Sequence, residues 1–230
     1  INDGLIEVLL AAKTAKDLGA RSVVLMAPYF PYFRQDSRFH PGECVSIPII
    51  GEFMDSCLDE IYVMDPHLHR EKTVGHVFKI KAHKLTANHL IVHYIQHKVK
   101  HPLIIGPDYE SYRWAKATAE LIGCDYAILK KKRYSSRHVE VAFNRKVDVA
   151  GKTLVIVDDI ISTGHTLLET IKLLKKMGVK KVTCICVHGV FAEGALGKLQ
   201  KVGAKVVSCN TIPNKVGTID VAEVFADRLK

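Results

Sequence analysis

The chemistry that this chain could perform is most visible directly after the apolar run at residues 154–157. Two carboxylates, Asp158 and Asp159, follow this run, and a Ser-Thr-Gly turn then leads into a helical pattern at 165–177. Backbone N–H groups of such a turn and of the helix N-terminus, together with side-chain donors, can surround a phosphate dianion. The residues that would do so are Ser162, Thr163, Gly164, His165 and Thr166. A helix cap does not need the two acids, so they favour a site that also binds the hydroxyl groups of a sugar.

Further polar clusters stand where other apolar runs end. They are Arg34-Gln35-Asp36 beyond a proline-containing loop, Asp65-Pro66-His67, Gly106-Pro107-Asp108, and the basic run from Lys130 to Arg133. In open α/β sheets, ligands bind beyond the carboxyl ends of the strands. The shared position of these clusters therefore predicts an active site at the strand ends.

The elements that must position these clusters alternate along the chain. Helical patterns occupy residues 3–18, 47–58, 88–99, 112–122, 165–177 and 192–202, and apolar runs occupy 23–26, 61–64, 103–105, 126–129, 154–157, 182–187 and 205–208. This alternation predicts an α/β fold with parallel sheets flanked by helices. Two such blocks predict two domains, residues 1–86 and 87–217. A C-terminal helix within 218–230 is expected to pack on the first domain.

Composition narrows the class of protein without identifying its substrate. The 230 residues carry a formal charge of +9, which suits nucleic acid or a substrate with several phosphates. Aromatic residues are not interleaved with basic ones, so a stacking platform for nucleic acid is not favoured. No apolar run approaches the roughly 20 residues that cross a bilayer, and no signal-peptide pattern opens the chain. We therefore expect a cytoplasmic protein that binds neither nucleic acid nor membrane.

Histidine and cysteine spacing raises the question of a metal site. His89, His93, His97 and His101 recur every four residues, which on a helix places the side chains along one face. No carboxylate or cysteine stands beside them, so we expect a polar helix face rather than a metal site. The six cysteines show no Cys-x-x-Cys spacing, and we expect buried thiols.

Two stretches resemble a known family. Residues 154–166 resemble the phosphoribosyl-binding motif that type I phosphoribosyltransferases share with ribose-phosphate pyrophosphokinases. Residues 28–36, with the Asn2-Asp3 helix before them, resemble a signature of the pyrophosphokinases alone. The chain is thereby identified as similar to the pyrophosphokinases, with two phosphoribosyltransferase-like domains, the first lacking its N-terminal part.

The resemblance implies a reaction and a role for each cluster. A ribose-phosphate diphosphokinase transfers the β,γ-diphosphoryl group of ATP to O1 of ribose 5-phosphate, and the family implies Mg²⁺ as cofactor and at least a dimer. ATP would be bound by Arg34, Gln35, Asp36 and His67, with His67 and Asp108 at the metal. Lys131 and Arg133 would be catalytic. Ribose 5-phosphate would be bound by Asp158, Asp159, Ser162, Thr163, Gly164, His165 and Thr166.

Three other functions are alternatives to the diphosphokinase reaction. A phosphoribosyltransferase would consume phosphoribosyl pyrophosphate without ATP, but Arg34-Gln35-Asp36 and His67 disfavour it. A non-catalytic regulatory paralogue would not need Lys131, Arg133 and His67. A nucleic-acid-binding module is motivated by charge alone, and its binding would depend strongly on salt.

Overall fold

A computed structural model describes most of the chain. It covers every residue except 1, 39, 69–72, 108–111, 134–138, 146 and 230, and at 113, 130–133 and 139–142 it describes the backbone only. The chain divides into two compact units, residues 1–86 with 222–230, and residues 87–221. The predicted domain border after residue 217 falls inside a strand, β10 (Gly217–Ile219), so the three predicted domains stay a prediction. In the described part of the chain, no helix is long and apolar enough to cross a membrane.

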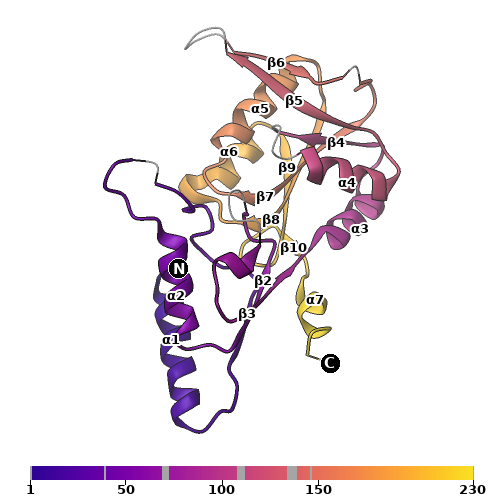
Figure 1. Cartoon of the computed structure of the whole chain (residues 1–230). Coiled ribbons are helices and arrows are strands. Elements are labelled where there is room, and N and C mark those ends of the chain that lie inside the picture. The colour runs from indigo at the N-terminus through magenta and orange to yellow at the C-terminus, as the bar shows by residue number, and fades with distance from the viewer. Residues whose placement is uncertain are drawn as a thin grey trace. The chain divides into compact units, whose positions relative to one another are not determined.

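The first unit contains a parallel sheet of three strands in the order β1-β2-β3. Its strands are β1 (Val24–Ala27), β2 (Glu60–Met64) and β3 (Lys81–Leu85). Helix α1 (Asn2–Asp17) precedes β1, helix α2 (Ser46–Asp55) connects β1 to β2, and the 3-10 turn η1 (Val74–His76) lies between β2 and β3. The short helix α7 (Ala222–Ala226) belongs to the same unit. Figure 1 shows α1 and α2 side by side.

The core of the first unit explains how α2 reaches the sheet. Ile61 and Val63 of β2 are fully buried, and they belong to one apolar cluster with Met54 of α2. A Cβ atom on Gly51 would stand against the carbonyl oxygen of Val77, so a glycine is needed for α2 to approach the segment after η1. Phe30, Phe33 and Phe78 close the cluster with edge-to-face ring contacts.

The second unit contains a sheet of seven strands in the order β10-β9-β8-β7-β4-β5-β6. Besides β10, the strands are β4 (Pro102–Gly106), β5 (Tyr126–Arg133), β6 (Val139–Phe143), β7 (Thr153–Ile161), β8 (Lys181–Gly189) and β9 (Ala204–Cys209). The predicted parallel pairing is confirmed with one exception, since β5 and β6 pair antiparallel. Only five residues separate the end of β5 from the start of β6, and so short a connection allows only antiparallel pairing, because parallel strands need a long crossover.

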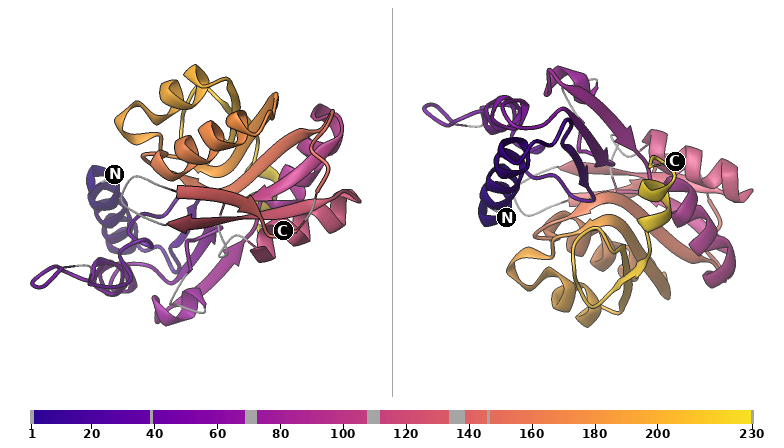
Figure 2. Two further views of the ribbon diagram at one scale, coloured as in Figure 1. Left: turned by 90° about the horizontal axis from the view of Figure 1, so that it is seen from above. Right: turned by 90° about the horizontal axis from the view of Figure 1, so that it is seen from below.

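Helices cover both faces of this second sheet. They are α3 (Asn88–Lys98), α4 (Tyr112–Ile122), α5 (His165–Lys176) and α6 (Ala195–Lys201), the last preceded by a 3-10 turn η2 (Ala192–Gly194). Both views of Figure 2 place α5 and α6 on one face and α3 and α4 on the other. The α/β architecture predicted from the alternation of apolar and amphipathic segments is therefore confirmed.

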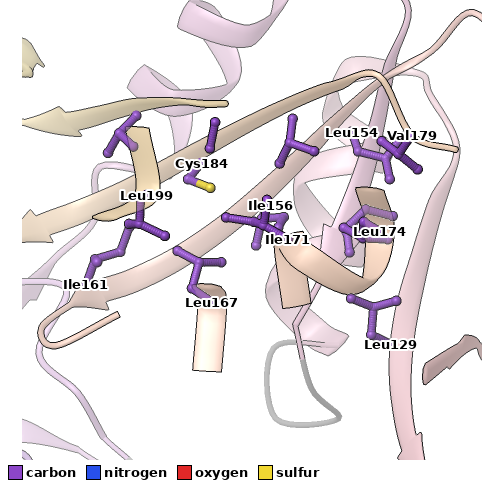
Figure 3. Packing of buried hydrophobic residues seen from close by; sticks show 14 of the residues in the cluster. Leu129, Leu154, Ile156, Ile161, Leu167, Ile171, Leu174, Val179, Cys184 and Leu199 are labelled. Atoms are coloured by element: carbon purple, nitrogen blue, oxygen red, sulfur yellow. The ribbon is translucent and has the colours of Figure 1, made fainter. Parts of the chain in front are cut away.

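The core beneath α5 and α6 holds the end of β7 in place. Leu167 and Ile171 of α5 and Leu199 of α6 pack against Ile156, Ile161 and the other residues of one cluster, as Figure 3 shows. Cys184 and Cys186 of β8 belong to this cluster, which confirms the prediction of buried thiols for them. The prediction is wrong for Cys44, which is exposed in the loop before α2. Burial raises the pKa of the Cys184 thiol to about 12, and the negative charge of Asp158 adds to that rise.

Candidate active site

The strand order of the second sheet brings three of the predicted clusters to neighbouring strands. From β4 the chain proceeds to β5 on one side, and from β7 it proceeds to β8 on the other, while β4 and β7 lie next to each other. Strand order thus reverses between β4 and β7. At such a switch point, ligands bind beyond the carboxyl ends of the strands. The carboxyl ends of β4, β5 and β7 therefore all lie at this switch point.

Both neighbours of β4 extend well beyond its end. Gly106, the last residue of β4, pairs with Ile128, and β5 continues for five residues to Arg133. On the other side Ile105 pairs with Ile156, and β7 continues for five residues to Ile161. At about 3.3 Å per residue, each neighbour projects roughly 16 Å past the level of its last pair with β4. The basic residues of β5 and the acids of β7 therefore stand on either side of the position where β4 ends.

Asp158 and Asp159 lie within β7 rather than after it. Sequence patterning predicted that the strand ends at Val157, but parallel pairing with β8 continues through Ile161. Both acids are half-buried, and the backbone N–H of Asp159 donates to Oδ1 of Asp158 at 3.0 Å. Asp158 pairs with Cys186 and lies on the side of the buried thiols of β8, whose pKa values its negative charge raises.

The turn that follows β7 has a backbone shape that requires glycine. Gly164 has φ +67°, in the left-handed region, and α5 begins at the next residue, His165. A Cβ atom at Gly164 would lie 3.3 Å from the Cβ of Ala195 and 3.6 Å from Cδ1 of Leu199. Ser162 and Thr163 are half-buried before it, whereas His165 and Thr166 are exposed in the first turn of α5. The N–H groups of that first turn have no acceptor within the helix, which is the arrangement that binds phosphate.

A loop that sequence reasoning did not single out supports this turn. After β8, the N–H of Phe191 donates to the carbonyl of Ile161 at 3.0 Å, which ties residues 189–194 to the end of β7. Phe191 and Glu193 have positive φ values of 48° and 54°, a conformation that is strained for residues with a Cβ atom. The carboxylate of Glu193 lies 3.6 Å from Nε2 of His165, so this acid, and not only a phosphate, is a partner for the imidazole.

His188 is a second residue that sequence reasoning missed. It pairs with Ile160 near the end of β8 and is 4% exposed. Its Nδ1 lies 2.9 Å from Oγ1 of Thr211, and that hydroxyl donates to the carbonyl of Val187 at 2.8 Å. Because the only hydroxyl proton of Thr211 is used on Val187, His188 must donate from Nδ1. A histidine at the end of an otherwise apolar run, directly before Gly189, was the available signal.

Replacing Thr211 with valine is expected to lower the free energy of unfolding by about 1–3 kcal/mol, because the buried Nδ1–H of His188 loses its acceptor at nearly unchanged side-chain volume. Urea denaturation measures this difference. Thr211→Ser keeps the hydroxyl and is expected to retain most of the stability. Equal losses in both variants would mean that packing, and not the hydrogen bond, accounts for the effect.

Lys131 and Arg133 belong to a strand and not to a loop after one. Sequence reasoning ended the strand at Leu129, but β5 continues through the basic run, pairing Lys131 with Val141 and Arg133 with Val139 of β6. The end of the apolar run did not predict the end of the strand, because basic residues occupy its last four positions. The predicted metal ligand Asp108 lies outside the described residues.

The remaining predicted site residues belong to the first unit. Arg34 and Gln35 are exposed, Asp36 is half-buried, and the side chain of Gln35 accepts a hydrogen bond of 2.7 Å from Ser46. The hydroxyl of Tyr32, which has φ +70°, donates to Asn2 at 2.6 Å and so fastens this loop to the start of α1.

The chain bends at Asp65, directly after β2. Asp65 is 4% exposed, has φ +31°, and donates its N–H to the carbonyl of Leu85 at the end of β3. His67, two residues later, is half-buried. The end of β2 thus bends at Asp65 before it reaches His67.

Two family models together match most of the chain, although their borders differ from those of the two structural units. A family model for the N-terminal domain of ribose phosphate pyrophosphokinase matches residues 1–57, and a model for the phosphoribosyl transferase domain matches residues 73–225. The ribose-phosphate pyrophosphokinase of Pyrococcus furiosus is 37% identical over 94% of this chain and 76% of its own length. That of Methanothermobacter thermautotrophicus is 36% identical over 100% of this chain and 79% of its own length.

A solved structure extends the similarity to the backbone. The phosphoribosylpyrophosphate synthetase of Mycobacterium smegmatis superposes with a TM-score of 0.83 at 26% identity, over 99% of this chain and 77% of that one. The similarity therefore includes both the first unit and the sheet that carries the turn at residues 162–166.

Proposed function

Because the chain belongs to the ribose-phosphate pyrophosphokinase family, we propose that it transfers the β,γ-diphosphoryl group of ATP to O1 of ribose 5-phosphate. The products are phosphoribosyl pyrophosphate and AMP. One observation carries this proposal: a left-handed glycine turn and the N-terminus of α5 stand at the switch point of the second sheet, in a chain whose first 57 residues match the N-terminal domain of the pyrophosphokinases. Phosphoribosyltransferases share the turn, so the N-terminal match favours the ATP-dependent reaction.

The sugar phosphate is proposed to bind at the end of β7. Backbone N–H groups of the turn and of the first turn of α5, with the hydroxyls of Ser162, Thr163 and Thr166, would hold the 5-phosphate. Asp158 and Asp159 would accept hydrogen bonds from the ribose hydroxyls. His165 would add a positive charge or a donor when it turns from Glu193 toward the phosphate. These contacts would fix the sugar so that O1 points away from α5.

The ATP side is proposed to use the first unit. A guanidinium suits polyphosphate oxygens because its N–H groups form paired, charge-assisted hydrogen bonds. Arg34 would supply these, with Gln35 and Asp36 beside it in the loop fastened by Tyr32. His67, beyond the bend at Asp65, would contact the triphosphate.

The diphosphoryl transfer itself joins O1 of the sugar to the β-phosphorus and breaks the bond from that phosphorus to the oxygen that remains on AMP. The proton of the O1 hydroxyl leaves to solvent or to a nearby base. Negative charge develops on the transferring group and on AMP, and fixed cations lower the energy of that arrangement. Lys131 and Arg133, on the extension of β5, would supply them.

A divalent metal ion would supply further positive charge at the phosphates, and the carboxylate of Asp108 suits Mg²⁺. This ion keeps several waters and is bound through one or two carboxylates together with substrate phosphates. Within the described residues no group of three His, Cys, Asp or Glu side chains could enclose a metal, which fits an ion held largely by substrate. We propose Asp108 and His67 as metal-contacting residues of their respective units.

The proposed reaction also bears on where the enzyme acts and on its oligomeric state. Both substrates are phosphorylated metabolites of the cytoplasm, where we expect the enzyme to act. We also propose an assembly of at least two copies, as the family resemblance implies.

The decisive experiment supplies the purified protein with ATP, ribose 5-phosphate and Mg²⁺ and measures AMP and phosphoribosyl pyrophosphate by ³¹P NMR. Both products are expected in equal amounts, and neither without ribose 5-phosphate. Release of AMP without the sugar would contradict the proposal. So would conversion of phosphoribosyl pyrophosphate and a nucleobase to a nucleotide in the absence of ATP.

A further inference from the structure

The outer face of α3 carries a feature that the diphosphoryl transfer does not use. His89, His93 and His97 are exposed along this face, whereas Ile91, Val92 and Ile95 of the same helix are buried. Residues four apart on a helix are neighbours on its surface. The helix therefore displays imidazoles one turn apart.

Two of these imidazoles are already arranged as a pair. The ring centroids of His93 and His97 are 4.1 Å apart, and the ring planes are tilted by 33°. Such proximity is unfavourable if both rings are protonated, because like charges one turn apart repel each other. An ion that binds both rings would replace that repulsion with attraction.

The hydrogen bonding of His97 determines which of its nitrogen atoms is a ligand. Its Nδ1 lies 2.8 Å from the backbone carbonyl of His93. A carbonyl oxygen can only accept, so Nδ1 carries the proton, and in the neutral ring Nε2 has the lone pair. Histidines that bind metals commonly donate their other ring N–H to a carbonyl or carboxylate in this way, which fixes both tautomer and orientation.

We propose that His93 and His97 form a chelating site for a borderline transition-metal ion such as Ni²⁺, Cu²⁺ or Zn²⁺. Imidazole nitrogens suit these ions, whereas Mg²⁺ prefers oxygen ligands. The described residues place no third His, Cys, Asp or Glu with the pair, so water completes the coordination, which the exposure of both rings permits. Affinity is expected to follow the order Co²⁺, Ni²⁺, Cu²⁺, with Cu²⁺ tightest and Zn²⁺ weaker than Cu²⁺.

The site is separate from the candidate active site. The C-terminal end of α3 leads through His101 into the first residue of β4, so His97 lies toward the amino end of that strand. The proposed phosphate turn and the extension of β5 lie beyond the carboxyl ends of the strands, on the opposite side of the sheet's length. An ion at His93 and His97 is therefore not the ion that accompanies ATP.

Calorimetric titration of the untagged protein with NiCl₂ tests the proposal. One Ni²⁺ per chain is expected, and His93→Ala or His97→Ala is expected to weaken binding at least tenfold. The matched control is His101→Asn, which removes an exposed imidazole next to α3 while asparagine tolerates the positive φ of 49° at that position. This control is expected to bind within about twofold of the unaltered protein, because its pair of rings is intact.

Two results would overturn the site. One is equal Ni²⁺ affinity in the unaltered protein and in both alanine variants, and the other is an equal loss in His101→Asn. A second measurement needs no variant: Cu²⁺, which is paramagnetic, is expected to broaden the ring signals of His93 and His97 first in an NMR titration. Broadening of all exposed histidines together would contradict the proposal, as would displacement of Ni²⁺ by an equal concentration of Mg²⁺.

Discussion

Replacing Lys131 with alanine is expected to lower kcat about 10²–10³-fold, the usual effect of removing one group that stabilises charge in a transition state. The physical reason is the negative charge that develops on the transferring diphosphoryl group, next to which we place this ammonium. The KM for ribose 5-phosphate is expected to change less than about threefold, because the phosphate turn on β7 is untouched. Steady-state rates of AMP formation measure both quantities.

Lys132 provides the matched control, since it lies between Lys131 and Arg133 on the same strand and carries the same charge. Lys132→Ala is expected to retain most of the activity, and Lys131→Arg to recover part of it. If Lys132→Ala loses as much kcat as Lys131→Ala, the net charge of β5 matters and not a specific ammonium. If Lys131→Ala raises KM alone, Lys131 binds substrate equally in the ground and transition states.

The boundary of β5 illustrates what patterning can and cannot predict. The apolar run at 126–129 correctly predicted the strand, because buried strands of a parallel sheet read as continuous apolar segments. The extension through Arg133 is a hairpin with β6, in which backbone pairing alone is enough to form a strand. β3 was missed for the same reason: Lys81, His83 and Lys84 are exposed, so the strand carries no apolar run.

The candidate site depends on the order of the strands in the sheet, which no local sequence pattern predicts. Sequence reasoning placed polar clusters at strand ends, but the order of the strands decides which ends are neighbours. β4 and β7 lie next to each other although about 50 residues separate them in the chain, and only this adjacency creates the switch point. Likewise, the loop at 189–194 supports the phosphate turn through a backbone hydrogen bond from Phe191, which depends on no side-chain type.

Gly164 gives the sharpest test of the phosphate turn, because one methyl group changes both its conformation and its packing. Gly164→Ala is expected to destabilise the protein by about 1–2 kcal/mol, the strain of a left-handed residue with a Cβ atom. The added Cβ would also make a tight contact of 3.3 Å with the Cβ of Ala195. We expect the turn to shift to relieve this contact, which moves its N–H groups away from the phosphate. A loss of about 1.4 kcal/mol in binding corresponds to a tenfold higher KM for ribose 5-phosphate, which we expect as a minimum.

A glycine at the other end of α5 provides a control that carries the same backbone strain but lies away from the proposed phosphate site. Gly178 follows α5, has φ +87°, and has no heavy atom within 4 Å of an added Cβ. Gly178→Ala should therefore show a similar loss of stability in urea denaturation with an unchanged KM. If Gly164→Ala loses stability to the same extent and its KM is also unchanged, the turn does not hold the 5-phosphate. A raised KM in Gly164→Ala alone would instead require that the shape of residues 162–166, and not the overall stability of the unit, determines sugar-phosphate binding.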